Sequence, residues 1–347
     1  MGQYRKAPNR GEIMLRIGFI GCGGIARQHA KHLSKMRSVK IIAACDVSIE
    51  TAKKFSADFD IPFFEKDYRK LLRIREIDAV WICTPTYQHA KPVIHAASLG
   101  KDVFCEKPIA LKMSEAKKMQ TICEKYGVKF TIGFVRRFDS MWGKFKQIIQ
   151  SDSLGSPVIW RFAAGGKPPH QWFRDIHKGG GPLIDGAIHN YDFALQIFGD
   201  VKSVQSSTLK LDETSVGADT GSVILNFKSG HQHTLIWSWG VASGTPVASL
   251  NDFIGPKGTL QFGDTRLKKS KPFDPEIFGT FTLKGAQGYE KLFKYRKKDM
   301  FLEQAKHIVR SFTSDKQPIV TASDGINALR IADAVLKAGG NGRTINL

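Results

Sequence analysis

The chain of 347 residues has few cysteines and no long hydrophobic run. The five cysteines, Cys22, Cys45, Cys83, Cys105 and Cys123, are isolated, odd in number and set mostly in apolar segments. The length of the chain excludes a disulfide-stapled miniprotein, and from the cysteine pattern we expect small buried thiols in a reducing compartment and no metal site. No stretch approaches the roughly 18 apolar residues of a membrane span, and no apolar segment follows the basic residues near the start, so we expect neither a membrane span nor a signal peptide, and a cytoplasmic protein.

Acidic residues are also scarce, because 32 Asp and Glu face 52 Lys and Arg, which gives a net charge of +20. Such an excess raises the question of nucleic acid, a membrane surface or an anionic substrate. The positive residues are spread over segments such as 69–75, 112–118, 268–271 and 296–298, and we find no zinc-finger spacing or aromatic RNA-binding motif. We therefore expect no nucleic-acid partner as the main task, and a side activity would show as steeply salt-dependent binding.

What the chain does contain is a globular composition, with 42% hydrophobic residues and 23 Phe. At roughly 150 residues per domain, its length predicts two domains. In the first part, short apolar runs alternate with segments of helical spacing, which is typical of a parallel, doubly wound α/β sheet. The predicted strands cover 15–20, 39–46, 79–85, 102–108 and 128–135, and Gly100 and Gly127 follow predicted helices as C-cap glycines.

After residue 137 the pattern changes to that of an α+β domain. Alternating strands joined by tight turns predict a large open antiparallel sheet, and two amphipathic helices follow near the C-terminus. We predict the domains 13–135 and 136–347, with the C-terminal helices packing back toward the first domain. The predicted elements are helices at 140–151, 183–198, 300–314 and 322–340, and strands at 158–164, 201–211, 221–229, 231–240, 250–255 and 258–263.

A glycine-rich turn, Gly21-Cys22-Gly23-Gly24-Ile25-Ala26, follows the first strand and opens a helix. Gly21 permits a tight turn, Gly23 lets the backbone approach a pyrophosphate, and the small Ala26 lets the helix pack closely on the sheet. Asp46 ends the second strand, where a carboxylate can accept hydrogen bonds from both ribose hydroxyls. The predicted cofactor-binding residues of this part are Gly21, Gly23, Gly24, Ile25 and Asp46.

Asp46 also bears on the choice of cofactor. A carboxylate repels a 2′-phosphate, and no arginine follows Asp46 in Val47 and Ser48. The sequence therefore predicts NAD rather than NADP.

Five ordered landmarks make the sequence similar to a known family. They are residues 21–26, Cys83-Thr84-Pro85-Thr86 with His89, Glu106-Lys107-Pro108, residues 133–139 (GFVRRFD) and residues 179–192 (GGGPLIDGAIHNYD). With this order and spacing, the chain resembles the Gfo/Idh/MocA oxidoreductases, named for glucose-fructose oxidoreductase and inositol dehydrogenase, from about residue 15 to its end. The resemblance implies a Rossmann domain, an α+β domain with an open sheet often used for dimerisation, and a homodimer or homotetramer formed through that sheet. It also implies a cis bond before Pro108.

The resemblance further implies a catalytic set of Lys107, Asp185 and His189. Oxidation of a secondary alcohol needs a base for the hydroxyl proton and a partner for the developing negative charge on oxygen. In the implied roles, His189 is the general acid/base, Lys107 polarises the reacting oxygen, and Asp185 orients and tunes the pair. Asp185 and His189 are four residues apart, which on a helix places both on one face.

Other residues are implied at the cofactor and the substrate. Thr84, Pro85 and His89 match the segment at the nicotinamide, together with Glu106 and Lys107, although His89 could equally cap the following helix. Arg136, Trp172 and Asn190 are candidate substrate residues, with the alternative that Trp172 only packs.

The leading prediction is an NAD-dependent dehydrogenase acting on a sugar, polyol or cyclitol hydroxyl. Residues 133–139 resemble their counterpart in inositol dehydrogenases, which favours cyclitols. One alternative is an enzyme that retains NAD and processes glycosides through transient oxidation. Another, from a different class, is a non-catalytic nucleotide-sensing protein, although such a protein has no need of Lys107, Asp185 and His189.

Overall fold

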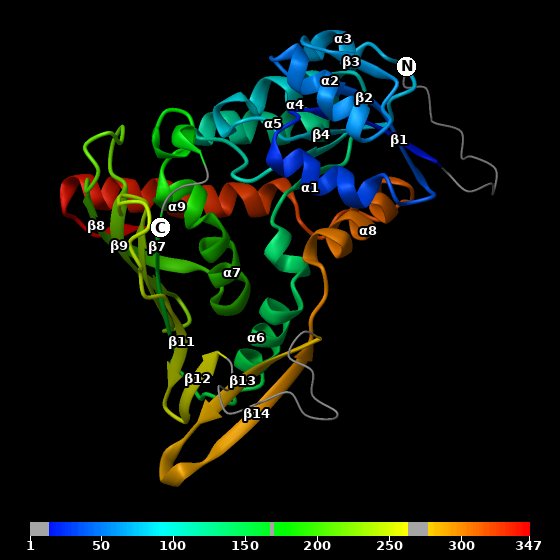
Figure 1. The fold of residues 1–347 in the computed structure, drawn as a ribbon. Helices are drawn as coiled ribbons and strands as arrows, with labels where there is room; N and C mark the ends of the chain where they lie inside the picture. The colour runs from blue at the N-terminus through cyan, green and yellow to red at the C-terminus, as the bar shows by residue number, and fades with distance from the viewer. Residues whose placement is uncertain (1–13, 167–169, 263–276) are drawn as a thin grey trace. The chain divides into compact units, whose positions relative to one another are not determined.

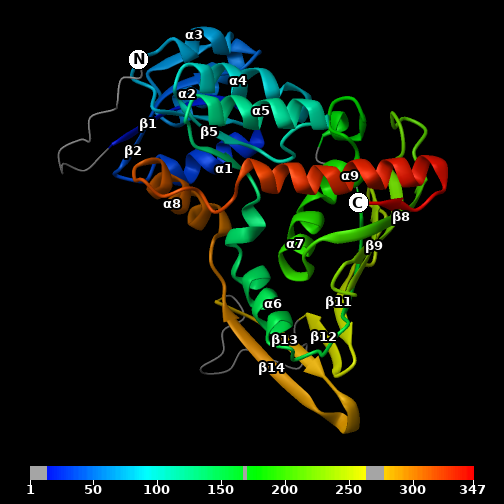
Figure 2. The same cartoon turned by 180° about the vertical axis from the view of Figure 1, so that it is seen from behind.

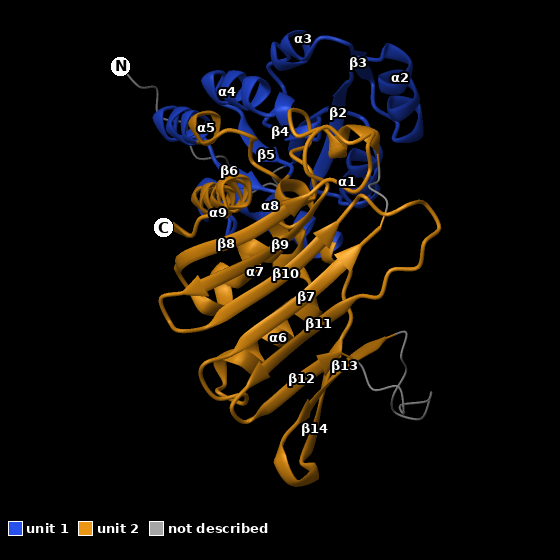
Figure 3. Cartoon of the chain, turned by 90° about the vertical axis from the view of Figure 1, so that its left-hand side faces the viewer, with its two compact units in different colours: residues 1–106, 117–133, 301–322 blue, residues 107–116, 134–300, 323–347 orange. Residues whose placement is uncertain are grey.

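The computed structural model, drawn from two sides in Figures 1 and 2, describes residues 14–166, 170–262 and 277–347. Residue 13, where the first predicted domain starts, and the basic segment 268–271 lie outside the described residues. The chain forms two compact units, coloured separately in Figure 3. Unit 1 comprises residues 1–106, 117–133 and 301–322, and unit 2 comprises residues 107–116, 134–300 and 323–347. The division into the domains 13–135 and 136–347 stays a prediction.

Unit 1 is built on a six-stranded parallel sheet. Its strands are Leu15–Ile20 (β1), Val39–Cys45 (β2), Phe63–Glu65 (β3), Ala79–Ile82 (β4), Asp102–Cys105 (β5) and Phe130–Ile132 (β6). They lie in the order β3-β2-β1-β4-β5-β6, and every neighbouring pair is parallel. The doubly wound class is confirmed, and five of the six strands fall where the apolar runs predict them. The sixth, β3, has only three residues, too few to show a period along the sequence.

Helices cover this sheet because its strands present apolar side chains to both faces. Those belonging wholly or mainly to unit 1 are Gly24–Leu33 (α1), Ile49–Asp58 (α2), Tyr68–Leu72 (α3), Ala90–Ser98 (α4), Met113–Lys125 (α5) and Met300–Phe312 (α8). Ile17 and Phe19 of β1 share one core cluster with side chains of α1, α2 and α8. Gly18, between them, faces the other way, and a Cβ there would lie 2.9 Å from Leu71 of α3. Gly100 and Gly127 have φ of +70° and +64°, which confirms the C-cap prediction.

Unit 2 is built on a nine-stranded sheet that contains one parallel pair. Its strands are Ile159–Gly165 (β7), Val201–Leu209 (β8), Thr220–Phe227 (β9), Gln232–Ser238 (β10), Leu250–Gly255 (β11), Gly258–Phe262 (β12), Phe278–Lys284 (β13), Glu290–Arg296 (β14) and Ile345–Asn346 (β15). The order is β14-β13-β12-β11-β7-β10-β9-β8-β15. β7 and β10 are parallel and the other neighbours are antiparallel, so the expected large antiparallel sheet is confirmed, with one parallel pair within it. The long connection from β7 to β10 permits the parallel pairing, which a hairpin pattern in the sequence does not reveal.

Helices pack on one face of this sheet. They are Ser140–Gln150 (α6), Ile188–Phe198 (α7) and Ala322–Asn341 (α9); Figure 3 shows α6 and α7 behind the sheet and α9 end-on beside β8. The face toward the viewer in Figure 3 is covered by none of these helices. Aromatic rings fill the covered side: Trp142 of α6 lies 4.5 Å from Phe193 of α7 and 5.8 Å from Trp160 of β7, between ring centroids. Such edge-to-face pairs add to the free energy of apolar burial.

Candidate functional sites

A tight glycine turn joins β1 to α1. Gly21 has φ +90°, and a Cβ there would lie 2.6 Å from the Cys83 carbonyl carbon and 2.8 Å from the Thr84 nitrogen. Only glycine fits this conformation and this space. Gly21 N also donates to Cys45 O at 2.8 Å. The turn therefore lies against the carboxyl ends of β2 and β4, where the strand order reverses around β1 and where doubly wound sheets bind ligands.

The N-terminus of α1 is open to an anion. The helix follows Gly23, no side chain caps its first N–H groups, and its first turn has no acidic residue. A Cβ at Gly23 or Gly24 would meet nothing within 4 Å. Ala26 is fully buried, and Ile25 packs on the core of unit 1, so these two hold the helix on the sheet. Unpaired backbone N–H groups and the helix dipole together attract a phosphate group to such an end.

The Asp46 carboxylate is fixed beside this turn. Its Oδ2 accepts a hydrogen bond from Cys22 N at 2.9 Å, and its Oδ1 accepts one from Ser48 N at 3.0 Å. A carboxylate has about four acceptor positions, so two remain for further donors. The neighbouring Val47 is 82% exposed and brings no positive charge.

The segment after β4 forms a compact turn that contains the short helix Thr86–Gln88 (η1), which follows Pro85. His89 is buried, and its Nε2 lies 2.9 Å from the Thr84 carbonyl oxygen, so its ring braces this turn. His89 occupies the N-cap position of α4 but makes no capping hydrogen bond through its side chain. Thr84 Oγ1 is buried without a hydrogen-bond partner among the described residues. This hydroxyl is a donor and acceptor that a ligand can use.

Glu106 is held in unit 1 by a residue that the sequence did not single out. His29 Nε2 lies 2.7 Å from Glu106 Oε1, and both side chains are almost fully buried. The rings of Phe104 and Phe301 pack edge-on against His29, at centroid distances of 4.9 and 5.5 Å. A Cβ on Gly133 would lie 2.8 Å from Glu106 Oε2, so only glycine leaves room for this carboxylate. His29 follows Ala26 by one helical turn, and a polar residue on that buried face was the available signal.

Lys107, the next residue along the chain, is paired in unit 2. Its Nζ lies 2.9 Å from Asp185 Oδ1 and 3.2 Å from the Asp185 carbonyl oxygen. The side chains are 19% and 7% exposed, so the amine is fixed in place yet still accessible. The Lys107–Pro108 peptide is cis, as the resemblance implies. The structure therefore joins two of the three predicted catalytic residues directly.

His189 is the third predicted catalytic residue, and it is held as a neutral imidazole. Burial lowers the pKa of His189 well below its ordinary value of 6.5, and the positive charges of Arg136 and Lys107 lower it further. Its Nδ1 is buried and has no hydrogen-bond partner among the described residues. The Phe134 ring packs edge-on against it at 5.9 Å. A neutral imidazole with a free nitrogen can accept a proton.

Asp185 is paired with Lys107, and its predicted orientation of His189 stays a prediction. Asp185 lies in a π-helical turn, Pro182–Gly186 (η4), and His189 lies in the first turn of α7. The two residues therefore belong to consecutive elements and not to one continuous α-helix. Gly186 permits the turn to pack tightly, because a Cβ there would lie 2.8 Å from the Trp237 ring.

Two of the predicted substrate residues, Arg136 and Asn190, contact each other. Arg136 Nη1 donates to Asn190 Oδ1 at 3.0 Å, and the guanidinium lies over the Trp142 ring at 5.0 Å. Asn190 is fully buried, and its Nδ2 has no partner among the described residues. Trp142 was not predicted, because an aromatic residue in an amphipathic helix gives no signal beyond core packing.

Trp172, the third predicted substrate residue, does not share the contacts of Arg136 and Asn190. It belongs to the short helix Gln171–Arg174 (η3) and stacks on Phe173 at a centroid distance of 3.8 Å. In the described part of unit 2 it makes no hydrogen bond or ring contact with Lys107, His189 or Arg136. The packing alternative accounts for what the structure shows of Trp172.

The described residues contain neither a metal-binding cluster nor a membrane-spanning helix. Among residues 14–166, 170–262 and 277–347, no cluster of three or more His, Cys, Asp or Glu side chains has the arrangement of a metal site. All five cysteines are free and buried, and burial raises the pKa of Cys45 to about 12. No helix of the described chain is long and apolar enough to cross a membrane.

The glycine turn fits a dinucleotide on its own geometry. The open space over Gly23 and Gly24 and the uncapped amides of α1 suit a pyrophosphate, and Asp46 has acceptor positions left for ribose hydroxyls. Thr84 Oγ1 adds an unpaired polar group in the adjoining turn. When bound, a nicotinamide dinucleotide would supply a hydride acceptor.

Known families agree with this assignment. Residues 15–134 match the oxidoreductase family with an NAD-binding Rossmann fold, and residues 146–347 match the C-terminal alpha/beta domain of the same oxidoreductase family. The chain therefore belongs to the Gfo/Idh/MocA family and is an oxidoreductase with an NAD-binding Rossmann fold.

Particular relatives are similar over nearly the whole chain. The myo-inositol 2-dehydrogenase of Thermotoga maritima is 29% identical over 96% of this chain and 98% of its own length. The scyllo-inositol 2-dehydrogenase (NAD(+)) of Bacillus subtilis is 27% identical over 97% of each chain. Among solved structures, a probable dehydrogenase from Thermotoga maritima is 28% identical and superposes with a TM-score of 0.76, covering 96% of this chain and 98% of that one.

Proposed function

We propose that this oxidoreductase uses NAD to oxidise a secondary hydroxyl of a sugar, polyol or cyclitol to a carbonyl. The observation that carries the proposal is the arrangement in unit 2, where Asp185 fixes the Lys107 amine, and burial, with the charges of Arg136 and Lys107, lowers the pKa of His189. The relatives named as inositol 2-dehydrogenases support a cyclitol within this class.

The proposed chemistry needs a cation and a base. Lys107 donates a hydrogen bond to the substrate oxygen and stabilises the negative charge that develops there as the C–H bond breaks. His189 takes the hydroxyl proton, because its lowered pKa leaves it unprotonated near pH 7. Asp185 positions Lys107 by accepting a hydrogen bond from its amine. A bound NAD would accept the hydride, so the C–H and O–H bonds of the alcohol would be replaced by a C=O bond, with the proton held by His189.

A substrate panel tests this proposal. The holoprotein with NAD should produce NADH, followed at 340 nm, with at least one of myo-inositol, scyllo-inositol, glucose, galactose or xylitol. Protein carrying the substitution Lys107→Met should give no signal above background in the same panel. NAD that co-purifies and does not exchange, without net NADH, would instead favour the NAD-retaining alternative. Reversible NAD binding with no turnover of sugars, polyols or cyclitols would favour the nucleotide sensor.

NAD rather than NADP is proposed from Asp46. Its carboxylate would repel a 2′-phosphate, while its two remaining acceptor positions suit ribose hydroxyls. The double substitution Asp46→Ser and Val47→Arg should shift the ratio of the NAD and NADP dissociation constants toward NADP by about tenfold or more. An unchanged ratio would remove Asp46 from the ribose site.

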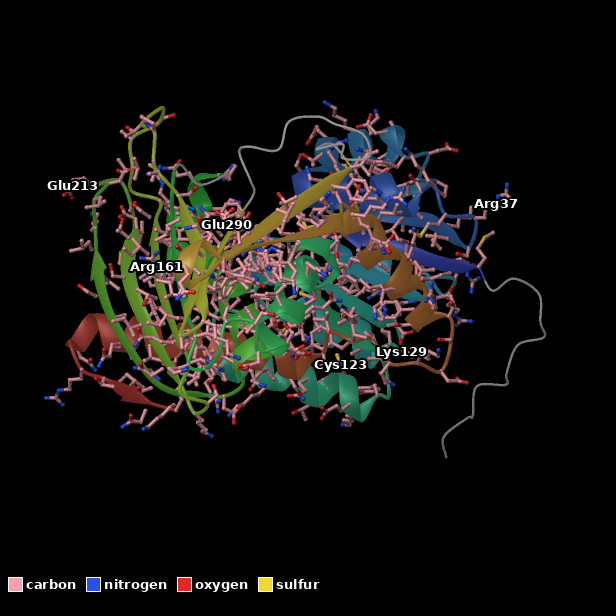
Figure 4. The ribbon with its side chains drawn as sticks, turned by 90° about the horizontal axis from the view of Figure 1, so that it is seen from below. Arg37, Cys123, Lys129, Arg161, Glu213 and Glu290 are labelled. Carbon is pink, nitrogen blue, oxygen red and sulfur yellow. The ribbon has the colours of Figure 1, made fainter. Side chains whose placement is uncertain are left out.

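A homodimer or homotetramer formed through the sheet of unit 2 is proposed from its uncovered face. Ile236 of β10 and Leu250 of β11 both flank Ala163 of β7 in register, so they share this face, and they are 45% and 40% exposed. Arg161, labelled in Figure 4, pairs with Asp252 beside them at 2.6 Å. Light scattering should give a mass of two or four chains for the wild type and a lower mass for Ile236→Glu.

A cytoplasmic location is proposed from the cysteines, because all five are free and buried.

A further inference from the structure

Two neighbouring arginines of unit 2 differ in how their charges are balanced. Arg137 Nε donates to Asp192 Oδ2 at 3.0 Å, and its Nη2 lies 2.9 Å from Asp324 Oδ1, so two carboxylates neutralise it. Arg136 instead donates to the neutral amide oxygen of Asn190. Within the described residues no carboxylate forms an ion pair with Arg136, and Asp139 acts on it only from a longer distance.

The fold places Arg136 in surroundings that disfavour its positive charge. Burial lowers the pKa of Arg136 to about 10, and Asp139 offsets only part of that effect. A desolvated cation without a counter-ion destabilises a protein unless a partner compensates it. Yet the side chain is held in one position by Asn190 on one side and the Trp142 ring on another. The guanidinium has five N–H donors, and the bond to Asn190 uses one of them.

Asn190 supplies a second, independent sign of a ligand. Because an arginine cannot accept a hydrogen bond, the Asn190 oxygen must face Arg136, and this fixes where the NH₂ group points. That NH₂ group is fully buried and has no partner among the described residues. A buried amide donor without an acceptor is destabilising, so an incoming acceptor would be favoured.

Both residues belong to the surroundings of the proposed base. Asn190 directly follows His189 in α7, and the charges of Arg136 and Lys107 both act on the His189 imidazole. Asp185 balances Lys107, whereas Arg136 is left as an excess positive charge. An anionic group is therefore the ligand that these residues lack.

We propose that Arg136 and Asn190 bind an anionic oxygen group, carboxylate or phosphate, carried by the substrate. The preferred substrate within the proposed class is then an acidic sugar or an acidic polyol, such as a uronate or a sugar phosphate, and neutral members of the class are turned over less efficiently. This inference rests on the proposed function, because it assigns a further part of the same substrate. Arg136 and Asn190 act as specificity residues, and the hydride and proton steps stay with the residues already described.

Matched pairs of compounds test the inference. The full-length protein with NAD is assayed on glucose against glucuronate, galactose against galacturonate, and glucose against glucose 6-phosphate. We expect kcat/KM for one acidic class to exceed that of its neutral partner by at least tenfold. Arg136→Met should lower kcat/KM for the acid at least tenfold more than for the neutral compound, mainly through KM, and Arg136→Lys should restore part of the loss. The exposed arginine Arg343 offers a matched control, Arg343→Met, which should change neither.

A binding measurement separates the two ways of failing. Calorimetry with glucuronate and glucose 6-phosphate, in the presence of NADH, should show binding to the wild type that weakens at least tenfold in Arg136→Met. Neutral substrates turned over as well as or better than acids, with equal losses in Arg136→Met, would overturn the anionic group and leave the dehydrogenase intact. Anion binding that depends on Arg136, with no turnover of any compound, would uphold the anion site and contradict the dehydrogenase. No anion binding and no preference would overturn the inference outright.

Discussion

Two regions of the molecule provide charge for ligands by different means. One is the glycine turn of unit 1, and the other is the group of Lys107, Arg136, Asp185, His189 and Asn190 in unit 2, here named the Lys107 centre. The turn uses backbone amides at the start of α1 and glycines that leave space, all within residues 21–26. The Lys107 centre uses side-chain charges from separate segments, at residues 107, 136 and 185–190. Backbone dipoles do not titrate and are changed only by altering the shape of the chain, whereas side-chain charges can be exchanged one at a time. Cofactor affinity and turnover should therefore respond to separate sets of substitutions.

Removing the amine of the Lys107 centre should have the largest effect. Lys107→Met should lower kcat by about 100-fold or more, because the developing charge on the substrate oxygen loses its partner. Binding of NADH, measured by calorimetry or by quenching of protein fluorescence, should change by less than about threefold. The exposed Lys117 on α5 provides a control, Lys117→Met, for the same change of side chain at the surface. Near-normal turnover in Lys107→Met would remove the lysine from the mechanism. A loss of NADH affinity as large as the loss of kcat would show that cofactor affinity and turnover do not depend on separate sets of residues.

Alanine substitutions at two glycines of the turn should affect different properties, stability at Gly21 and NAD affinity at Gly23. Gly21→Ala combines φ +90° with backbone 2.6 Å from the new Cβ, so it should destabilise the protein by about 2 kcal/mol or more in urea unfolding. Gly23 has φ −73° and open space, so Gly23→Ala should fold normally and bind NAD about tenfold more weakly, because its methyl group occupies the space proposed for the pyrophosphate. Unchanged NAD affinity in Gly23→Ala would place the phosphates elsewhere.

The pH dependence of turnover and of NAD affinity should distinguish the Lys107 centre, which contains a titrating histidine, from the glycine turn, which binds through backbone groups. Because the pKa of His189 is lowered, its base form persists to acidic pH. The acidic limb of log(kcat/KM) should therefore lie well below pH 6.5, and NAD affinity should not change with pH across the same range. The unfolded chain takes up a proton near pH 6.5 that folded His189 resists, so this residue reduces stability as pH falls below 6.5. His189→Gln should therefore lose less stability than the wild type between pH 7 and pH 5 in urea titrations. An acidic limb at or above pH 6.5 would show that His189 is not the neutral base proposed.

The same contrast explains what the sequence could reveal. The glycine turn and Asp46 were predictable because a strand, a turn and a helix start carry their pattern in consecutive residues, and the parallel sheet followed from the alternation of strands and helices. The Lys107–Asp185 pair was only partly predictable, since the roles came from a resemblance and the two residues are 78 positions apart, so no local pattern reports their contact. The pairing of His29 with Glu106 spans 77 residues, and nothing local reports it.

In unit 2 the missing predictions have similar causes. β15 contains two residues, too few for any period, and the parallel pairing of β7 with β10 is decided by the whole sheet rather than by either strand. β13 and β14 form an outer pair of the sheet, and β14 is largely charged and exposed, so its alternation of apolar and polar residues is weak. Elements of this kind are fixed by tertiary packing more than by intrinsic preference.

Native mass spectrometry of the purified protein, before and after adding NAD and NADP separately, tests the central claim most directly. The account predicts that the glycine turn takes up one NAD per chain reversibly, with NAD preferred over NADP, and that Lys107→Met protein does the same. If neither nucleotide binds to the folded protein, the assignment of the glycine turn and Asp46 is contradicted, and with it the NAD-dependent chemistry proposed for Lys107 and His189.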